Sequence, residues 1–152
     1  MLKNVQVKFS SEEAKELYNG VLSPSTSFSA GIDLRIMEDI TLQPNSTCFV
    51  SSGISIFINN RNYCAKVFPR SGLGHKSGIV LGNLTGIIDA DYQGEVKLSL
   101  WNRSNEVREL KKGDRVCQMI FEHVVHPNFK VVDEFDNTTE RGDGGFGSSG
   151  KK

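Results

Sequence analysis

The chain has 152 residues, a length that forms one domain able to bury its own core. Its 18 basic residues balance 18 acidic ones, so charge gives no reason to expect a nucleic-acid partner or binding to a membrane surface. Cys48, Cys64 and Cys117 are widely spaced and odd in number, which predicts reduced thiols, and the scattered histidines argue against a zinc site. No apolar run approaches the ~20 residues of a membrane-spanning helix, and the start lacks a signal-peptide pattern, so we expect a cytoplasmic protein.

Alternating apolar residues predict strands along most of the chain. Each alternating set has the period-2 spacing of a strand with one buried face. The sets are Val5, Val7 and Phe9; Ile54, Ile56 and Ile58; Tyr63, Ala65 and Val67; and Val96, Leu98 and Leu100. Turn-forming sequences separate them: SPSTS at 23–27, QPNS at 43–46, NNRN at 59–62, KKGD at 111–114 and HPN at 126–128. Many short strands divided by turns predict an all-β sandwich or barrel.

Two segments depart from the strand pattern. In SSEEAKELYNG, residues 10–20, Ser10 and Glu13 have the spacing of a capping box and Gly20 is a stop signal, so we expect one short helix. Apolar residues nearly vanish after Thr138, which predicts a domain over residues 1–137 and a flexible, glycine-rich tail over residues 138–152. Such a tail either binds something or stays disordered.

Small polar residues and glycine cluster where the strand pattern does not need them. In SAGIDLR, residues 29–35, Asp33 lies on the face opposite its apolar neighbours, either as part of a solvated face or as an acid beside a cation or basic side chain. In the segment 68–84, Pro69 ends a strand, and Arg70, Ser71 and Gly72 then offer a guanidinium, a hydroxyl and free amides, a set that suits phosphate.

The two best-known phosphate-loop motifs are not matched in this segment. G-x-x-x-x-G-K-[ST] fails because His75 separates Gly74 from Lys76. G-x-G-x-x-G fails because Ser77 stands at the third glycine position, and no βαβ pattern surrounds it. The segment alone is therefore a weak indication of phosphate binding.

The segment NLTGIIDADYQGEVKLSLWN, residues 83–102, has the outline of a β-hairpin, because Gly86 and Gly94 bracket IIDADYQ. Asp89 follows two β-branched apolar residues, so we expect a partly desolvated carboxylate that can act as a general base on water. The alternative is an ordinary acidic turn. Tyr92 offers a flat face with a polar tip.

Two further stretches lie near the C-terminus. GDRVCQMIF, residues 113–121, predicts a turn followed by a buried strand in which Gln118 is the neutral polar residue, and such residues usually satisfy core backbone groups. In RGDGGFGSSG, residues 141–150, Arg141 can pair with a terminal phosphate, Phe146 can stack on a flat group, and glycine amides and serine hydroxyls add donors. These features predict a flexible lid for a nucleotide, against the alternative of a disordered terminus.

Taken in order, these stretches resemble the five motifs of the trimeric dUTP pyrophosphatases (dUTPases), most closely the bacterial-type members. The matching segments are AGIDL, PRSG, G-x-I-D-x-D-Y-x-G-E, GDR-x-x-Q and RG-x-GGFG-x-x-G, and they extend from about residue 29 to residue 150. Ser149 departs from the threonine of many members but keeps the hydroxyl. The resemblance implies a jelly-roll-like β fold, a homotrimer with sites shared between subunits, and hydrolysis of dUTP to dUMP and pyrophosphate with Mg²⁺. It also implies a role in limiting uracil incorporation into DNA and supplying dUMP for thymidylate synthesis.

The resemblance implies a role for each matching residue. Asp89 orients and deprotonates the attacking water, Tyr92 packs under the deoxyribose, and Gln118 supports the phosphate site. Asp33 faces Mg²⁺ through a water molecule, with no side chain touching the metal directly. The residues implied to contact the rest of the substrate are Arg70, Ser71 and Gly72 for the phosphates; Asn83, Gly86, Ile87, Ile88 and Lys97 for uracil; and Arg141, Phe146, Gly147, Ser148 and Ser149 for the closing lid.

Two other functions compete with this hypothesis. A dCTP deaminase shares the fold and part of the motifs, but that family uses a glutamate over C4 of cytosine, whereas GIIDADY fits the hydrolase pattern. A nucleotide-sensing or interaction module is possible because a fold does not prove activity, although a pure binder has no need of a base at Asp89. The hydrolase is the function we expect.

Overall fold

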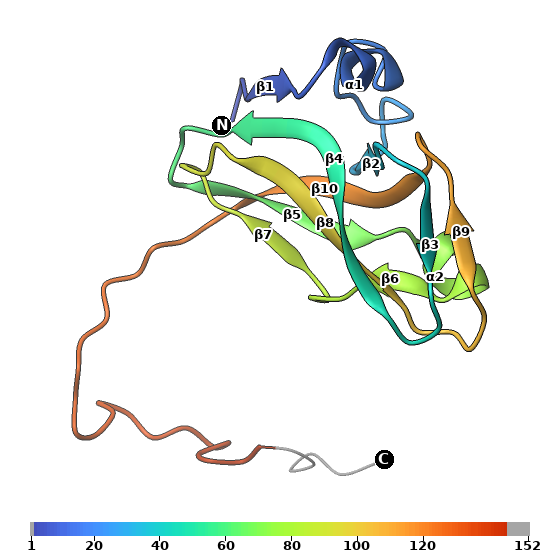
Figure 1. Ribbon diagram of the computed structural model, residues 1–152. Coiled ribbons are helices and arrows are strands. Elements are labelled where there is room, and N and C mark those ends of the chain that lie inside the picture. Colours follow the sequence, from blue (N-terminus) through green and yellow to red (C-terminus); the bar gives the residue numbers. More distant parts are fainter. Residues whose placement is uncertain (1, 146–152) are drawn as a thin grey trace.

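The computed structural model describes residues 2–145, which form two four-stranded antiparallel sheets and a two-stranded ribbon (Figure 1). The strands of the first sheet, in spatial order, are β1 (Gln6–Phe9), β4 (Thr47–Phe57), β8 (Glu95–Asn102) and β6 (Ile79–Leu81). Those of the second are β2 (Ile32–Arg35), β10 (Arg115–His123), β5 (Tyr63–Pro69) and β7 (Gly86–Ile88). The ribbon pairs β3 (Ile40–Leu42) with β9 (Arg108–Leu110). The predicted all-β, jelly-roll-like sandwich is confirmed.

The core lies between the two sheets and contains the inward faces of the predicted strands. Its members from both sheets include Leu34, Ile54, Ile56, Ala65, Val67, Val96, Leu98, Leu100 and Met119. β1 fits the prediction less well, because it lies at the edge of its sheet and Val7 is 38% exposed. An edge strand with an open side is a site where another chain can add. Cys48, Cys64 and Cys117 are free, and burial raises the pKa of the Cys117 thiol to about 12.

The predicted helix exists, but its N-cap is displaced by one residue. α1 (Glu12–Leu17) is capped by Ser11, whose hydroxyl accepts a hydrogen bond from the Ala14 amide at 3.0 Å. The prediction of Ser10 as the cap was therefore wrong. The Ser10 amide instead donates to the Gly53 carbonyl of β4 at 2.9 Å, because the chain there still follows the strand.

A second short helix, α2 (Ser71–Ser77), was not predicted. Its sequence SGLGHKS contains two glycines, which disfavour a helix when it is considered alone. Tertiary contacts hold it in place: Gly74 is buried with an ideal Cβ position 3.3 Å from Val80, and Arg103 Nη2 donates to the Gly74 carbonyl at 3.2 Å. A residue with a larger side chain at position 74 would crowd the sheet below.

The predicted hairpin over residues 83–102 was also wrong. β7 pairs with β5 in the second sheet, whereas β8 pairs with β4 and β6 in the first. β7 can approach β5 closely because Gly86 has no side chain, and a Cβ there would lie 3.3 Å from Val67. The connection at 89–94, between β7 and β8, therefore crosses from one sheet to the other (Figure 1).

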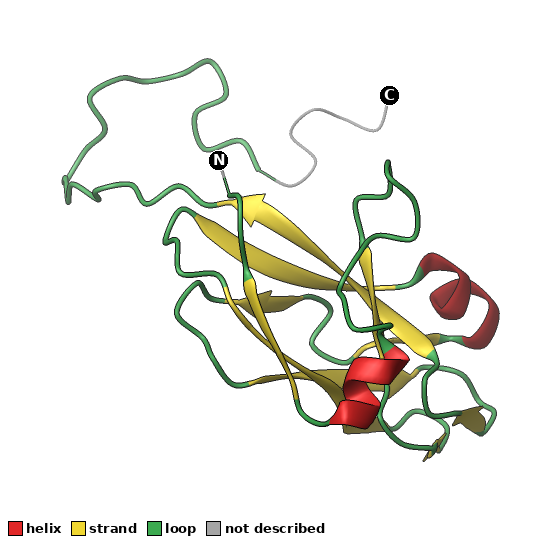
Figure 2. Ribbon diagram, turned by 90° about the horizontal axis from the view of Figure 1, so that it is seen from above, coloured by secondary structure: helices red, strands yellow, loops and turns green. Residues whose placement is uncertain are grey.

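After β10 the chain leaves the sandwich and runs away from both sheets (Figures 1 and 2). Near its start, His126 Nε2 lies 2.6 Å from the Arg61 carbonyl oxygen. Farther along, Phe129, Val131 and Phe135 are 92%, 96% and 89% exposed. Within residues 2–145, no helix has the length and apolar character needed to span a bilayer.

Candidate active site

A cavity of about 620 Å³ opens beside the start of α2 and brings three of the predicted motifs together. We call it the Arg70 pocket. Its lining residues are Ser25, Ser29, Ala30, Gly31, Asp33, Arg70, Ser71, Gly72, Leu73, Lys76, Ser77 and Gln118. Asp33 comes from β2, Arg70 and Ser71 from the junction of β5 and α2, and Gln118 from β10. Segments far apart in the sequence thus meet around one cavity.

Asp33 holds two arginines at the wall of this pocket. Its Oδ1 lies 2.9 Å from Arg70 Nε, and its Oδ2 lies 3.0 Å from Arg115 Nη1. Arg70 Nη1 also donates to the Arg115 carbonyl at 3.1 Å. The structure therefore decides between the two interpretations of Asp33: it is an acid beside basic side chains. The guanidinium of Arg70 is oriented before any ligand arrives.

Arg115 and Lys76 were not singled out from the sequence. Arg115 is part of GDR at the start of β10, and its role depends on the antiparallel pairing of β10 with β2, which local patterns do not give. Lys76 lines the pocket from α2, a helix that was itself not predicted. For Arg115, an available signal was its position three residues before Gln118 in the same segment.

Gln118 is partly buried, satisfies a backbone carbonyl as expected, and also borders the pocket. Its Nε2 donates to the Pro69 carbonyl at 3.1 Å, and it stands opposite Asp33 in the pairing of β10 with β2. Gly31 makes room for it, because a Cβ at Gly31 would lie 2.6 Å from Gln118 Oε1. A side chain at position 31 would therefore force Gln118 to shift.

Gly72 shows the opposite behaviour. A Cβ added there would meet nothing within 4 Å, and its backbone does not have a positive φ. Neither packing nor backbone conformation requires glycine at this position. Because Gly72 lines the Arg70 pocket, its missing side chain leaves the backbone of the first turn of α2 open to an approaching ligand.

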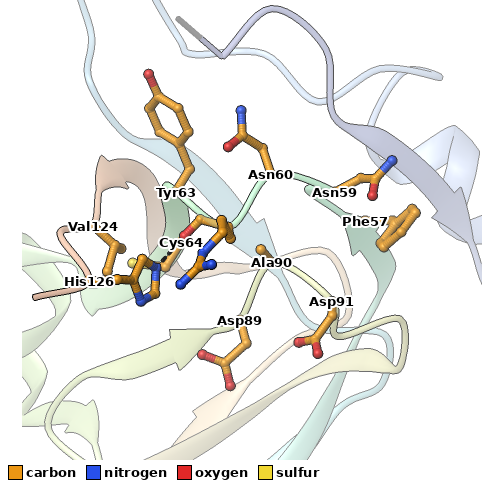
Figure 3. A pocket seen from close by; sticks show the side chains of 11 residues that line it. Phe57, Asn59, Asn60, Tyr63, Cys64, Asp89, Ala90, Asp91, Val124 and His126 are labelled. Atoms are coloured by element: carbon orange, nitrogen blue, oxygen red, sulfur yellow. Dashed lines mark hydrogen bonds between the residues drawn. The ribbon is translucent and has the colours of Figure 1, made fainter. Parts of the chain in front are cut away.

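The predicted base, Asp89, lines a different cavity of about 480 Å³, which we call the Asp89 cavity. Its other lining residues are Phe57, Asn59, Asn60, Arg61, Tyr63, Cys64, Ala90, Asp91, Val124 and His126. Figure 3 shows the Asp89 and Asp91 carboxylates pointing in the same general direction, away from the side chains of Asn60 and Tyr63. No residue lines both this cavity and the Arg70 pocket.

Asp89 is exposed, so the expected partial desolvation is wrong for the single chain. The two apolar residues before it do not cover it: Ile87 is itself 63% exposed, and Ile88 packs toward the core. The other predicted uracil contacts share this open edge. Asn83 and Lys97 are exposed, while Gly86 is partly buried against β5.

Tyr92 is fixed by the backbone that follows it. Its hydroxyl donates to the Glu95 carbonyl at 3.0 Å, and its ring lies so close to Gly94 that a Cβ there would be 2.4 Å from the phenol oxygen. The side chain remains 43% exposed. One side of the ring is thus held by the chain, and the rest of it is open.

The tail does not reach either cavity in its described part. Arg141 is exposed, and its Nε donates to the Gly144 carbonyl at 2.8 Å. Arg141 lines neither the Arg70 pocket nor the Asp89 cavity. The predicted lid residues Phe146, Gly147, Ser148 and Ser149 lie outside the described residues.

The carboxylates fit a metal ion held mainly by a ligand and by water. Among residues 2–145 there is no group of three or more His, Cys, Asp or Glu side chains that could hold a metal. Asp33 Oδ1 accepts one guanidinium contact, which leaves a lone pair for water, whereas Oδ2 accepts from both Arg115 and the Ser25 hydroxyl. Mg²⁺ commonly keeps several waters and takes its remaining ligands from substrate phosphates, so this arrangement suits it.

A β-sandwich with a preformed arginine pocket and an exposed carboxylate loop has the features expected of a nucleotide hydrolase. The dUTPase family model matches residues 18–150. The chain belongs to the dUTPase family, and as an enzyme it is a dUTP diphosphatase.

Several known proteins are similar to this chain, some in sequence and some in structure. A deoxyuridine 5'-triphosphate nucleotidohydrolase of Histophilus somni is 53% identical over 126 residues, which cover 82% of this chain and 83% of that protein. The solved dUTPase of Staphylococcus bacteriophage 80alpha with dUPNHPP has a TM-score of 0.85 at 26% identity and covers 97% of this chain and 99% of that one. At 21% identity, a dUTPase of phage phi11 of S. aureus, described with a coordinated structural Mg(II) ion, shares the fold with a TM-score of 0.78 over 89% of this chain and 100% of that one.

Proposed function

We propose that this chain hydrolyses dUTP to dUMP and pyrophosphate by in-line attack of water on the α-phosphorus. The observation that carries the proposal is the Arg70 pocket, where Asp33 fixes a guanidinium beside a hydroxyl and a glycine whose open side faces the cavity. Attack on phosphorus needs positioned donors and a positioned water more than covalent help from the protein. The pocket supplies those donors.

The phosphates bind in the Arg70 pocket. Arg70 offers a fork of charged donors, Ser71 a hydroxyl, and Gly72 an unobstructed amide. Gln118 keeps the Pro69 carbonyl satisfied and so holds the wall of the pocket in shape. When bound, Mg²⁺ draws charge from the phosphate oxygens, and Asp33 would face it through a water molecule.

Asp89 orients the attacking water and accepts its proton. A carboxylate performs this role best when water is excluded around it, and in the single chain Asp89 is exposed. A cover is therefore needed. The separation of Asp89 from the Arg70 pocket supports a cover that comes from a second copy of the chain.

Uracil and deoxyribose are recognised by the segment that runs from Asn83 through β7 and the loop over residues 89–94 to the start of β8. Asn83 and the main chain of Gly86, Ile87 and Ile88 contact the base, with Lys97 nearby on β8. A tight backbone around C5 rejects thymine, because its methyl group would overlap the chain. Tyr92 packs under the deoxyribose and leaves no room for a 2′-hydroxyl.

The functional assembly is a homotrimer whose sites are shared between subunits. β1 is an open edge strand, and Phe129, Val131 and Phe135 are exposed apolar residues on a segment that leaves its own sandwich. An apolar segment of this kind gains stability by docking on a neighbouring copy. Residues 1–137 then form the domain, and residues 138–152 the lid, which brings Arg141, Phe146, Gly147, Ser148 and Ser149 over the nucleotide. In the cell the reaction limits uracil incorporation into DNA and supplies dUMP for thymidylate synthesis.

Pyrophosphate release from dUTP, dTTP, dCTP and UTP with Mg²⁺ tests the proposed reaction. We expect rapid release from dUTP and slow release from the other three. Ammonia released from dCTP would instead identify a deaminase, and binding of dUTP without turnover would identify a nucleotide-sensing module.

Exchange of subunits between two inactive variants tests the sharing of sites. Asp89→Asn lacks the base and Arg70→Ala lacks the phosphate guanidinium, and the two residues line different cavities. Unfolded and refolded together, the two chains should regenerate dUTP hydrolysis well above either variant alone, because some sites receive a good base and a good arginine. No recovery, with mixed trimers verified by native mass spectrometry, would place both residues of a site on one chain. The same experiment with Asp89→Asn and a chain truncated before Arg141 tests whether the tail of one subunit closes over the site of another.

A further inference from the structure

The strands β4 and β8 lose their register next to the loop that carries Asp89 and Tyr92. Ser51 pairs with Lys97, and Ser55 pairs with Glu95, so residues 52–54 of β4 lie opposite a single residue of β8. Gly53, inside this bulge, has a φ of 72°, a left-handed conformation that favours glycine. A bulge of this kind leaves amides without ladder partners, and something else must satisfy them.

The Glu95 carboxylate and the Ser51 hydroxyl, which accepts from the Gly53 amide at 3.1 Å, supply the acceptors. Glu95 Oε1 accepts a hydrogen bond from the Gly53 amide at 3.1 Å and another from the Ser51 hydroxyl. Glu95 is also the first residue of β8, directly after the loop over residues 89–94. One carboxylate thus ties the end of the catalytic loop to the middle of the neighbouring strand.

Hydrogen bonds from other segments hold the bulge in place, so it is a fixed support for the Glu95 carboxylate. The Ser51 carbonyl accepts from the Met37 amide at 3.2 Å, the Ser52 carbonyl from the Tyr18 hydroxyl at 2.9 Å, and the Gly53 carbonyl from the Ser10 amide at 2.9 Å. These contacts come from three separate segments of the chain. Movement of the bulge would break several of them together.

At the loop end, the backbone of Glu95 contacts the side chain of Tyr92. The Tyr92 hydroxyl donates to the Glu95 carbonyl at 3.0 Å, and the ring rests against Gly94. Displacement of the Glu95 backbone would therefore move the ring with it. The Tyr92 ring is 43% exposed, and its open part is the part available to a sugar.

We propose that Glu95 is a positioning residue for sugar selection: its carboxylate, held by Ser51 and Gly53, fixes the backbone on which the Tyr92 ring rests. The inference rests on the proposed role of Tyr92 under the deoxyribose. Glu95 acts through Tyr92 and need not touch the nucleotide. Its loss should loosen the ring and admit UTP more readily, with little effect on the Arg70 pocket, which is built from other strands.

The test compares kcat/KM for dUTP and UTP in variants of the two residues. Glu95→Ala removes both acceptor contacts and should narrow the dUTP-to-UTP ratio about tenfold, the equivalent of about one hydrogen bond. Glu95→Gln keeps an acceptor oxygen and should retain most of the wild-type ratio. Ser51→Ala removes one of the two donors and should give an intermediate ratio. A purely structural role would lower the Tm of Glu95→Ala and leave the ratio unchanged, and that result would overturn the inference.

Two tyrosine variants complete the experiment. Tyr92→Ala tests the proposed sugar contact itself: an unchanged ratio in this variant would reject the role of Tyr92 and, with it, that of Glu95. A narrowed ratio in Tyr92→Ala with an unchanged ratio in Glu95→Ala would reject the Glu95 inference alone. If Glu95→Ala does not fold, Tyr92→Phe carries the test, since it removes only the hydroxyl that meets the Glu95 carbonyl. The ratio should then narrow in Tyr92→Phe, and a wild-type ratio would overturn the inference.

Discussion

The Arg70 pocket and the loop that carries Asp89 differ in how complete each is within one chain. In the pocket, Asp33 pairs with two arginines, and Gln118 and Gly31 fit closely together. In the loop, Asp89 is exposed and Ile87 is 63% exposed. The proposed phosphate pocket is therefore complete in the single folded chain, whereas the surroundings of the proposed catalytic base, Asp89, and of Tyr92 are open to solvent.

Removing the proposed base gives the largest expected effect and separates the two regions most clearly. Asp89→Asn should lower the rate of dUTP hydrolysis at least ~100-fold, the scale for loss of a general base, and leave dUTP binding nearly normal because the Arg70 pocket is intact. Isothermal titration calorimetry and single-turnover kinetics measure the two quantities. A variant that keeps more than about a tenth of the wild-type rate would remove Asp89 from the role of base.

Two glycines of the Arg70 pocket form a matched pair with opposite expectations. Gly72→Ala places a methyl group in open space within α2, so the Tm should not fall, while kcat/KM for dUTP should fall about tenfold because the methyl occupies ligand space. Gly31→Ala places its Cβ 2.6 Å from Gln118 Oε1 and should lower the Tm. Thermal unfolding and steady-state kinetics of both variants test the pair.

If Gly72→Ala lost stability and kept its activity, the open side of Gly72 would have a structural purpose. The Arg70 pocket would then no longer count as the ligand-ready region. An unchanged Tm in Gly31→Ala would show that Gln118 can move aside without cost, and would weaken the distinction between a rigid pocket and an open loop.

Alkaline pH should affect the junction between the two regions. Burial raises the pKa of Tyr18 from 10.0 to about 12, and its hydroxyl joins Arg35 of β2 to Ser52 of the β4 bulge. The folded state holds this proton more tightly than the unfolded state, so the stabilisation is complete below pH 10 and is lost as the pH rises toward 12. Urea unfolding between pH 9 and pH 12 measures this loss, which should be shallower in Tyr18→Phe. An identical pH dependence in Tyr18→Phe would assign the alkaline loss to other groups.

The sequence predicted the fold and several residues that line the pocket, because these depend on local patterns. Period-2 alternation identified the inward faces of β4 and β8, and clustered small polar residues identified Arg70, Ser71 and Gly72. These signals are contained in stretches of a few residues. These local signals do not depend on contacts with distant parts of the chain.

The features that the sequence did not predict depend on long-range contacts. α2 contains two glycines and forms because Arg103 and Val80 hold it. The role of Arg115 follows from the register of β10 against β2. The supposed hairpin failed because β7 pairs with β5, so the turn signals around Asp89 marked a connection between sheets. The placement of Asp89 and Arg70 in separate cavities likewise needs the three-dimensional structure.

The burial of Cys117 gives β10 a chemical reporter. The thiol is fully buried between Val116 and Gln118, and its pKa of about 12 leaves almost no thiolate at neutral pH. Alkylating reagents attack the thiolate, so they can modify Cys117 only when β10 separates from its neighbours. The rate of alkylation at this one atom therefore measures how often the strand that carries Arg115 and Gln118 opens.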